Sequence, residues 1–254
     1  MLARRRHDEI VKILRNSGVV RVSLLATELS VSEMTIRRDL ELLEGVGIVE
    51  KFHGGAILVG RPTTDEPGFD VKRRLQTGVK ESIAQHAAAR VRPGSSVGLT
   101  AGTTTWMLAK YLDMRPLTVV TNSISVAEVL YPAASPSLDV VLTGGVRTPS
   151  DALVGPVAVS SLSSLHVDVL FMGVHGMTER AGFTTPNLLE AETNQAFIRS
   201  AAELVVVADN TKFGVTGLST ICPLERADVL IVDSELDPTA TEVLRSRIAS
   251  VELV

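Results

Sequence analysis

Residues 30–44 read SVSEMTIRRDLELLE, and this stretch decides how the first quarter of the chain folds. Its apolar side chains at Ile36, Leu40 and Leu43 are spaced i, i+4 and i+7, which places them on one face of a helix. The two adjacent arginines of the stretch must then lie away from that face. In a chain that is acidic overall, such a pair is either an ordinary solvated surface or a surface that binds an anion.

The segments around this helix complete a small module. Apolar spacing predicts a helix over residues 8–17, a short strand over residues 19–22 and a second helix that Ser23 caps. Ser32 is predicted to cap the third helix. Apolar runs on both sides of a His-Gly-Gly turn predict a β-hairpin over residues 48–59. Helix, helix, turn, helix and hairpin make a winged helix-turn-helix.

Length and charge favour two domains. With 254 residues, 45% of them apolar, the chain is long enough for one small and one medium domain. The formal net charge is −4, but residues 1–61 carry ten Lys and Arg against eight Asp and Glu, whereas residues 62–254 carry fifteen against twenty-one. The sequence predicts a weakly basic module on an acidic body, which agrees with nucleic-acid binding without establishing it.

Cysteine, histidine and hydropathy patterns narrow the class of protein. The single cysteine, Cys222, excludes an intramolecular disulfide and a cysteine-cluster zinc site, and we expect a cytoplasmic protein. The five histidines never fall at metal-ligand spacing, so no metal is predicted. No apolar run suits a signal peptide or reaches the roughly 18 residues of a membrane span, so neither export nor membrane insertion is expected.

The second part of the chain has a different organisation. Residues 60–78 combine prolines and glycines without a sustained period, which predicts a linker, with a short helix expected at its end, between a domain at residues 1–59 and one at residues 79–254. The second domain alternates helical patterns with short apolar runs, which predicts an α/β fold with a mostly parallel sheet. Its expected strands are residues 96–100, 117–121, 139–143, 167–173, 204–209, 228–233 and 251–254.

Small and polar residues follow these strands, and strand-end loops of a parallel sheet converge on one crevice. The sharpest of these loops is AGTTT, between a strand and a helix. Gly102 allows close approach of the backbone, and hydroxyls stand beside the free N–H groups of the helix start, which suits a phosphate or carboxylate. Simple helix capping explains the string about equally well. The hydroxyls belong to Thr103, Thr104 and Thr105.

Residues from other loops would converge on the same anion. Lys212 would supply a positive charge, and Asp209 would accept hydrogen bonds from sugar hydroxyls. Taken alone, a solvated lysine and a capping aspartate are the simpler interpretations. Helix capping or a tight turn likewise explains each of the remaining candidates alone, which are Asn122, Ser123, Gly144 and Gly145.

In this order, the motifs of the chain resemble the DeoR family of bacterial transcriptional regulators, and the resemblance spans nearly the whole chain. It implies a DNA-binding domain joined to an effector domain similar in fold to ribose-5-phosphate isomerase. It also implies a phosphorylated sugar or sugar derivative as effector, no enzymatic activity and no cofactor. The motifs are VS at 31–32, TIRRDL at 35–40, HGGA at 53–56, AGTTT at 101–105, VTNS at 120–123, LTGG at 142–145 with Arg147, the turn region from Gly176 to Gly182, EAETNQAFI at 190–198 and ADNTKFG at 208–214.

On this hypothesis the third helix enters the major groove of an operator. Ser32 and Thr35 lie near the entering end. Arg38 is then placed to read a guanine edge, and Arg37 to contact a phosphate. Asp39 is expected to pair with one of the two arginines. Further candidates for contacts to the DNA backbone are Lys51 and His53 in the wing and Arg4 to Arg6 ahead of the first helix.

Three hypotheses remain open. The leading one is a repressor that responds to a ligand and acts at least as a homodimer, because one small domain makes too few DNA contacts. The second is a sugar-phosphate isomerase or lyase with an accessory N-terminal domain, in which Glu190 and Glu192 would help to shuttle protons. Many family members have an acidic residue where this chain has Thr100, which cannot act as a base. The third is a winged helix that binds protein.

Overall fold

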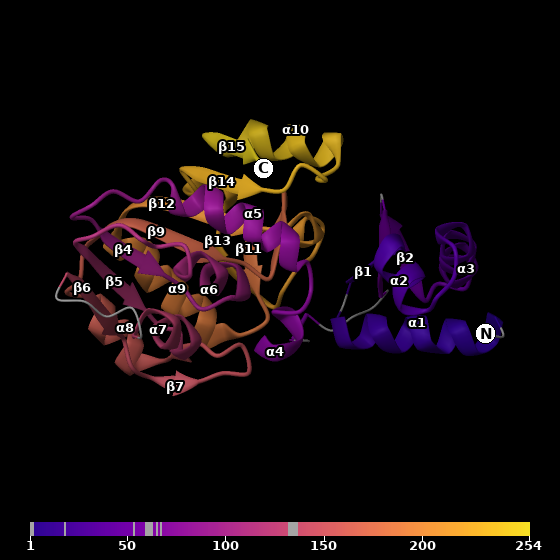
Figure 1. The fold of residues 1–254 in the computed structure, drawn as a ribbon, viewed down its shortest axis with the longest axis horizontal. Coiled ribbons are helices and arrows are strands. Elements are labelled where there is room, and N and C mark those ends of the chain that lie inside the picture. The colour runs from indigo at the N-terminus through magenta and orange to yellow at the C-terminus, as the bar shows by residue number, and fades with distance from the viewer. Residues whose placement is uncertain are drawn as a thin grey trace. The chain divides into compact units, whose positions relative to one another are not determined.

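The computed structural model describes residues 3–17, 19–52, 54–58, 63–64, 66, 68–131 and 137–254. The chain forms two compact units, the N-terminal unit Met1–Pro67 and the C-terminal unit Gly68–Val254, and each has its own apolar core. Figure 1 shows the fold of each unit. None of the helices in the described ranges is long and apolar enough to cross a membrane.

The N-terminal unit is a winged helix-turn-helix, as predicted. Its three strands form an antiparallel sheet in the order β1-β3-β2, so that the hairpin is extended by the first strand. The apolar stripe of Ile36, Leu40 and Leu43 is buried against Ile10 and Leu25. The elements are α1 (Ala3–Ser17), β1 (Val19–Arg21), α2 (Val22–Glu28), α3 (Glu33–Gly45), β2 (Val49–Phe52) and β3 (Gly55–Leu58).

The caps of α2 and α3 differ in how well the sequence predicts them. Ser32 caps α3 as predicted, because its Oγ accepts a hydrogen bond from the Thr35 N–H at 3.2 Å. The prediction that Ser23 caps α2 is wrong. The chain passes directly from β1 into the helix at Val22, so Arg21 occupies the N-cap position and makes no capping bond with its side chain.

The C-terminal unit is an α/β domain built on one sheet of seven strands in the order β15-β14-β12-β9-β4-β5-β6. All neighbouring strands of this sheet are parallel, in agreement with the predicted fold class. Its strands are β4 (Ser96–Leu99), β5 (Leu117–Thr121), β6 (Leu138–Leu142), β9 (Val167–Gly173), β12 (Ala201–Ala208), β14 (Val229–Val232) and β15 (Ser250–Leu253). Its longer helices are α5 (Thr77–Ala88), α6 (Thr103–Ala109), α7 (Ile124–Leu130), α8 (Pro156–Leu162), α9 (Leu188–Ser200) and α10 (Pro238–Arg247).

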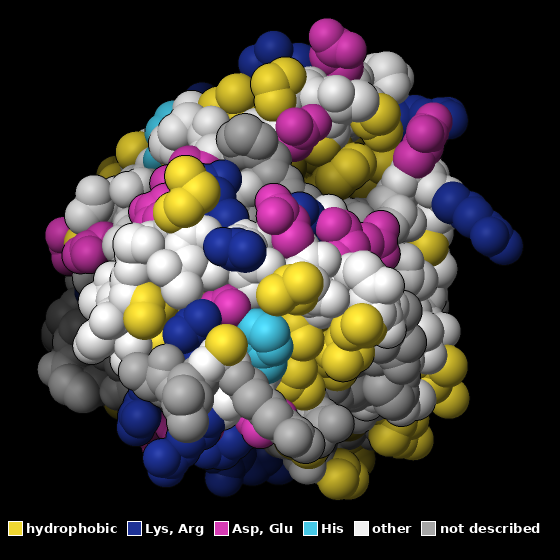
Figure 2. Space-filling model, turned by 90° about the vertical axis from the view of Figure 1, so that its right-hand side faces the viewer, with side chains coloured by type: hydrophobic (Ala, Val, Ile, Leu, Met, Phe, Trp, Pro, Cys, Tyr) yellow, Lys and Arg dark blue, Asp and Glu magenta, His cyan; other side chains and the backbone are white. Residues whose placement is uncertain are grey.

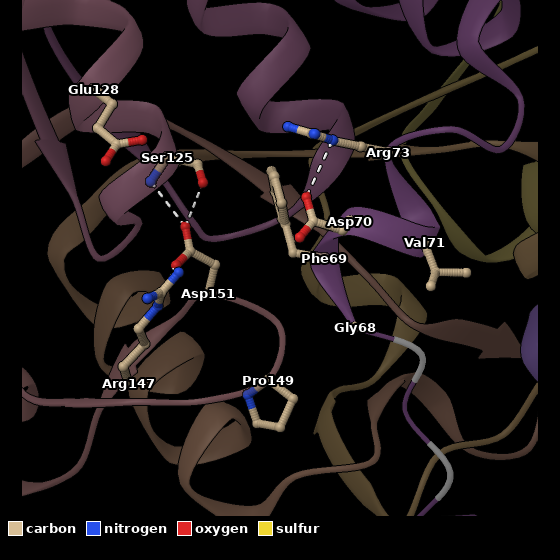
Figure 3. A pocket seen from close by; sticks show the side chains of 10 residues that line it. All are labelled: Gly68, Phe69, Asp70, Val71, Arg73, Ser125, Glu128, Arg147, Pro149 and Asp151. Carbon is tan, nitrogen blue, oxygen red and sulfur yellow. Dashed lines mark hydrogen bonds and ion pairs between the residues drawn. The ribbon is translucent and has the colours of Figure 1, made fainter.

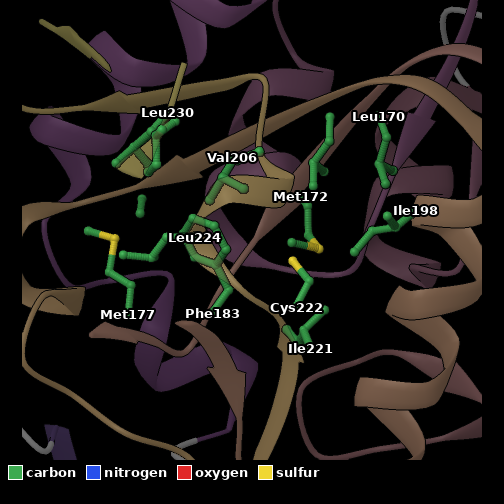
Figure 4. Packing of buried hydrophobic residues seen from close by; sticks show 14 of the residues in the cluster. Leu170, Met172, Met177, Phe183, Ile198, Val206, Ile221, Cys222, Leu224 and Leu230 are labelled. Atoms are coloured by element: carbon green, nitrogen blue, oxygen red, sulfur yellow. The ribbon is translucent and has the colours of Figure 1, made fainter. Parts of the chain in front are cut away.

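Two apolar clusters cover the two faces of this sheet. On one face, side chains such as Met172 and Val206 pack with residues of α8, α9 and α10. Figure 4 shows part of this cluster, including Ile198 of α9. On the other face, Phe171 and Val205 pack with residues of α5, α6 and α7. Successive residues of a strand point to opposite faces, so the central strands are buried on both sides. This double burial explains the unbroken apolar runs from which the strands are predicted.

Two small antiparallel sheets are absent from the sequence-based prediction. The strands of one sheet have only two residues each and those of the other are rich in Gly and Thr, so no apolar run separates them from turns. Gly182 illustrates this, because its φ is 69° and a Cβ there would lie 2.3 Å from the Cys222 carbonyl oxygen. The strands are β7 (Val146–Arg147) with β8 (Leu153–Val154), and β10 (Gly176–Thr178), β11 (Gly182–Thr185) and β13 (Ser219–Cys222).

The stretch predicted as a linker, residues 60–78, is described only in part, and from Gly68 onward it belongs to the C-terminal unit. It contains the short helix α4 (Phe69–Lys72). The Phe69 ring is buried and meets the Trp106 ring edge to face, with centroids 6.0 Å apart. The Phe69 N–H donates to the Pro149 carbonyl at 3.1 Å. A short helix is expected from the sequence at the end of this stretch, but a single aromatic anchor leaves no periodic pattern from which its bounds could be predicted.

Candidate functional site

The outer surface of α3 carries four of the residues predicted to contact DNA. Ser32 and Thr35 lie at its start, with their hydroxyl oxygens 2.9 Å apart. Both arginines are exposed, and Arg37 forms an exposed ion pair with Glu33 at 3.4 Å. Arg38 has no hydrogen bond or ion pair to any residue within the described ranges. Its guanidinium group is therefore available to an external partner.

Asp39 does not pair with either of these arginines, and that prediction is wrong. Its buried carboxylate accepts hydrogen bonds from Arg6, with Nη2 to Oδ1 at 3.0 Å, and from His7, with Nε2 to Oδ1 at 2.8 Å. Arg6, predicted to lie ahead of the first helix, is inside α1, which begins at Ala3. Burial raises the pKa of Asp39, but the hydrogen bonds from Arg6 and His7 and their charges outweigh it and hold that pKa below its ordinary value.

The wing offers one described candidate. Lys51 on β2 lies with its Nζ 3.3 Å from Glu44 and 3.7 Å from Glu41, so its charge is shared with the acidic end of α3. His53 lies outside the described residues. On the face that Figure 2 views, basic and acidic side chains are intermixed with hydrophobic ones. Several Lys and Arg side chains gather along the lower edge of that face.

In the C-terminal unit, the predicted site residues lie in loops at the carboxyl ends of parallel strands. Two of them serve the fold. The buried Asn122 accepts a hydrogen bond from the Ala101 N–H at 2.8 Å and donates to the Leu153 carbonyl at 3.1 Å. The buried Ser123 caps α7 by accepting from the Val126 N–H at 3.2 Å. The capping interpretation therefore accounts for Ser123.

Three further candidates also have structural roles. The Thr105 hydroxyl donates to the Thr100 carbonyl at 2.7 Å, which holds the start of α6 against the end of β4. Gly144 and Gly145 have φ angles of 73° and 123°. A Cβ on Gly145 would lie 2.5 Å from the Val154 carbonyl oxygen, so only glycine fits this turn beside β8.

Thr103 and Thr104, at the start of α6, differ from these three. The two residues are largely buried, yet neither hydroxyl has a hydrogen-bond partner among the residues that the structure describes. Gly102 precedes them at the N-cap position, and a Cβ there would lie 3.2 Å from the Thr105 hydroxyl oxygen. Both hydroxyls therefore remain able to hydrogen-bond a ligand.

Asp209 and Lys212 lie together after β12. Asp209 is buried and accepts hydrogen bonds from the N–H, at 3.1 Å, and from the hydroxyl of Thr211. Burial raises the pKa of its carboxyl, but the charges of Lys212 and Lys80 and the bonds from Thr211 hold it below its ordinary value. Lys212 ends the short helix η2 (Asn210–Lys212) and is half-buried. Within the described part of the chain, its ammonium makes no hydrogen bond or ion pair.

Lys80 is a further candidate, which the sequence-based prediction misses. It is 3% exposed, and its Nζ donates to the carbonyl oxygens of Lys72 at 2.7 Å and Leu75 at 2.6 Å. Burial lowers its pKa to about 8; the charge of Asp209 opposes this shift, and those of Lys212 and Lys72 add to it. A buried cation thus lies within electrostatic reach of the Asp209 and Lys212 pair.

The position of Lys80 in the sequence could have identified it as a candidate. It lies on the buried face of α5 with Ile83, Ala84 and Ala87, at spacings i, i+3, i+4 and i+7. A charged residue in an apolar stripe is costly unless it has partners, so such a position indicates a functional or structural role.

A pocket of about 350 Å³ lies between α4 and the chain around residues 147–151 (Figure 3). Its buried carboxylate, Asp151, accepts hydrogen bonds from the Ser125 N–H at 2.8 Å and from Arg147 Nε at 2.6 Å. None of the residues predicted to bind an effector lines this pocket. It lies where the Phe69 N–H donates to the Pro149 carbonyl, and neither Lys80 nor Lys212 lines it.

Glu190, a residue of the isomerase hypothesis, and Thr100, which stands where many family members have an acidic residue, are both engaged within the fold. Thr100 is fully buried, and its hydroxyl oxygen accepts from the Gly173 N–H at 3.2 Å. The Glu190 carboxylate accepts hydrogen bonds from Thr148 at 2.5 Å and Thr185 at 3.2 Å. Among the described residues, no group of three His, Cys, Asp or Glu side chains is placed to hold a metal ion.

Comparison with known proteins covers nearly the whole chain. The family described as DeoR-like helix-turn-helix domain matches residues 6–61, and the family described as DeoR C terminal sensor domain matches residues 75–234. The putative aga operon transcriptional repressor of Escherichia coli O157:H7 is 34% identical over 98% of this chain and 92% of its own length. The regulator GlpR of Haloferax volcanii is 35% identical over 97% and 96%.

Two more similarities complete the comparison. The lactose phosphotransferase system repressor of Staphylococcus aureus is 31% identical over 97% of this chain and 98% of its own length. Among solved structures, ribose 5-phosphate isomerase A of Methanocaldococcus jannaschii is 16% identical, with a TM-score of 0.40 over 54% of each chain.

Proposed function

The chain belongs to the DeoR family of DNA-binding transcriptional regulators, and we propose that it represses genes of carbohydrate metabolism until a phosphorylated sugar or sugar derivative binds it. It is therefore a regulator and not an enzyme, and the isomerase alternative is not favoured. The observation that carries the proposal is the exposed Arg38 on the outer face of α3, without a described partner in a winged helix-turn-helix.

In this proposal, α3 enters the major groove of the operator with its capped end first. Arg38 reads a guanine edge with its two parallel N–H groups, and Arg37 contacts a phosphate. Ser32 and Thr35 contact the DNA beside the entering end, and Lys51 and His53 contact the backbone from the wing. The intermixed charge of the N-terminal unit supports few phosphate contacts per protomer, so a homodimer or larger assembly on paired half-sites is proposed.

We place the effector at the end of β12 and the start of α6. Lys212 is the positive charge that the anion meets, and the positive charge of Lys80 adds to its attraction. The hydroxyls of Thr103 and Thr104 are proposed to donate to the phosphate, and Asp209 to accept from a sugar hydroxyl. The other predicted effector residues, Gly102, Thr105, Asn122, Ser123, Gly144 and Gly145, are assigned to shaping the loops.

The effector must bind more tightly to the state that releases DNA, because only a difference in affinity between two states shifts their populations. We propose that binding releases the operator, which gives expression when the sugar is present. A repressor that meets both chromosomal DNA and a sugar phosphate would act in the cytoplasm.

Replacing Lys212 with alanine is expected to weaken the sugar-phosphate response by on the order of tenfold or more, because a charge-assisted hydrogen bond contributes about 1.5–3 kcal/mol. A thermal-shift screen of sugar phosphates first identifies a ligand, since binding to the native state raises its apparent stability. Titration calorimetry with that ligand then compares the variant with the wild type.

The control is Arg245→Ala, which removes one positive charge from the exposed face of α10. Arg245 has no hydrogen bond or ion pair to a described residue, so its loss tests net charge alone. We expect wild-type affinity in this control. An unchanged response in Lys212→Ala would remove Lys212 from the site.

Affinity for a phosphate monoester is expected to fall as the pH rises from about 7 to about 9. Lys80, whose pKa is about 8, loses its proton in this range, while the ligand stays a dianion because its second pKa is near 6. The charged groups that act on Lys80 are Asp209, Lys212 and Lys72. Calorimetric titrations across this range should show the decline in the wild type and a much smaller one in Lys80→Met. Equal pH dependence in both proteins would contradict the assignment.

A further inference from the structure

We propose that Lys80 couples occupancy of the effector site to the position of α4, the first helix of the C-terminal unit. This inference rests on the proposed function, because it takes the anion to bind beside Lys212. It adds a route by which binding is communicated to the chain that leads to the N-terminal unit.

Lys80 holds the end of α4 directly. Its ammonium donates to the carbonyl oxygen of Lys72, the last residue of α4, at 2.7 Å, and to that of Leu75 at 2.6 Å. An ammonium group has three N–H donors. Two of these donors are used by the two carbonyls, and Lys80 has no further hydrogen-bond acceptor among the described residues. One donor of a buried cation therefore remains for a ligand.

The same cation belongs to the proposed effector site. α5, which carries Lys80, packs against β12, and the strand leads into Asp209 and Lys212. The charges of Asp209 and Lys212 both act on Lys80. A dianion beside Lys212 would favour the charged form of Lys80 and offer an acceptor to its third donor. Because a charged ammonium is the stronger donor, the hydrogen bonds from Lys80 to the carbonyl oxygens of Lys72 and Leu75 would then strengthen as well.

α4 is a helix whose position depends on such contacts. It has four residues, too few to be stable without packing. Besides Lys80, the contacts that hold it in the described part of the chain include the Phe69 ring against Trp106, the Phe69 N–H on Pro149, and the Lys72 ammonium, which donates to the Ser150 hydroxyl at 2.8 Å. A change at Lys80 therefore acts on one of the contacts that hold α4.

Chain connectivity makes this helix a suitable relay. Gly68 is the first residue of the C-terminal unit, and α4 begins at the next residue. Tighter docking of α4 therefore changes the constraint on the preceding chain, which runs to the N-terminal unit. The coupling needs two states of α4, one docked on Lys80 and one released, that bind the effector with different affinity. The docked state would bind it more tightly, because Lys80 is then held with its third donor available to the anion.

The test uses the full chain and inorganic phosphate at one fixed pH. Calorimetry measures phosphate binding, and amide hydrogen exchange of residues 69–75 measures the docking of α4. In the wild type, saturating phosphate is expected to slow exchange of this segment on the order of tenfold, as for one additional charge-assisted hydrogen bond. In Lys80→Met, phosphate should still bind, more weakly, and leave the exchange of α4 unchanged.

Two further variants make the result specific. Arg245→Met, a matched substitution on the exposed face of α10, should bind phosphate and slow the exchange of α4 as the wild type does. Phe69→Leu should speed exchange of α4 before phosphate is added, while keeping phosphate affinity within about twofold. Slowed exchange in phosphate-bound Lys80→Met, equal to that of the wild type, would overturn the role of Lys80. Absence of phosphate binding by the wild type would instead overturn the proposed effector site and this inference with it.

Discussion

Replacing Arg38 with alanine is expected to remove most of the sequence specificity of operator binding. A bidentate arginine contact to guanine supplies about 1–3 kcal/mol of discrimination, and a homodimer would lose it in both half-sites. Arg38 has no described partner within the protein, so the truncation leaves the fold intact. Fluorescence anisotropy on an operator fragment, selected from genomic DNA, measures this loss against a scrambled fragment of equal length.

Arg37→Ala is the matched control on the neighbouring position. As a phosphate contact, Arg37 should contribute equally to operator and scrambled DNA, and its loss should lower the salt slope by about 1 for each protomer bound. Its exposed ion pair with Glu33 contributes little to stability. If the Arg38→Ala protein discriminated between the two fragments as well as the wild type, Arg38 would not read bases.

Asp39→Asn is expected to destabilise the N-terminal unit by about 3 kcal/mol, the lower end of the range for breaking a buried ion pair. The substitution replaces the buried carboxylate that pairs with Arg6 and His7 by a neutral amide. A small domain has little stability to lose. Differential scanning calorimetry of the full chain should show a lower transition temperature for this unit, with faster amide exchange in α1 and α3.

The control for this prediction is Glu33→Gln, which breaks the exposed pair with Arg37. Its effect should stay below about 0.5 kcal/mol. Unchanged exchange in α1 and α3 of the Asp39→Asn protein would mean that the ion pair does not hold these helices together.

The same carboxylate gives the N-terminal unit an acid-sensitive part of its stability. The pKa of Asp39 in the folded state lies below its unfolded value, which is about 3.9. Its stabilising contribution is therefore complete above the unfolded pKa and is lost as the pH falls through the folded pKa. Asp39→Asn should lack this part. Denaturation midpoints of the wild type and of Asp39→Asn should be compared as the pH is lowered below about 5. If the two midpoints fell in parallel with pH, Asp39 would not be the source of this acid sensitivity.

Elements that repeat a simple pattern could be predicted from the sequence. α3 follows from one apolar stripe and the Ser32 cap, and the central strands follow from runs that are buried on both faces. The short antiparallel strands could not be predicted, because Gly182 and its neighbours carry turn residues into a sheet. The bounds of α4 could not be predicted either, although a short helix is expected near it, since one ring at Phe69 anchors it.

Partners of charged residues are harder to predict than their positions. Asp39 lies next to Arg38 in sequence but on the opposite, buried side of the helix, where Arg6 of α1 reaches it. Lys80 and Asp209 are far apart in the chain and come together only because α5 packs on β12. Such pairs depend on tertiary packing, which local spacing does not encode.

The central claim is that this chain binds a specific DNA sequence and releases it when a sugar phosphate binds beside Lys212. Its most direct test is anisotropy of the full-length protein on its selected operator, titrated with the sugar phosphate found by thermal shift. We expect salt-sensitive, sequence-specific binding that the ligand abolishes in the wild type, and that persists at the same ligand concentration in Lys212→Ala. Operator binding that no sugar phosphate changes, or turnover of the sugar phosphate without DNA binding, would contradict the claim.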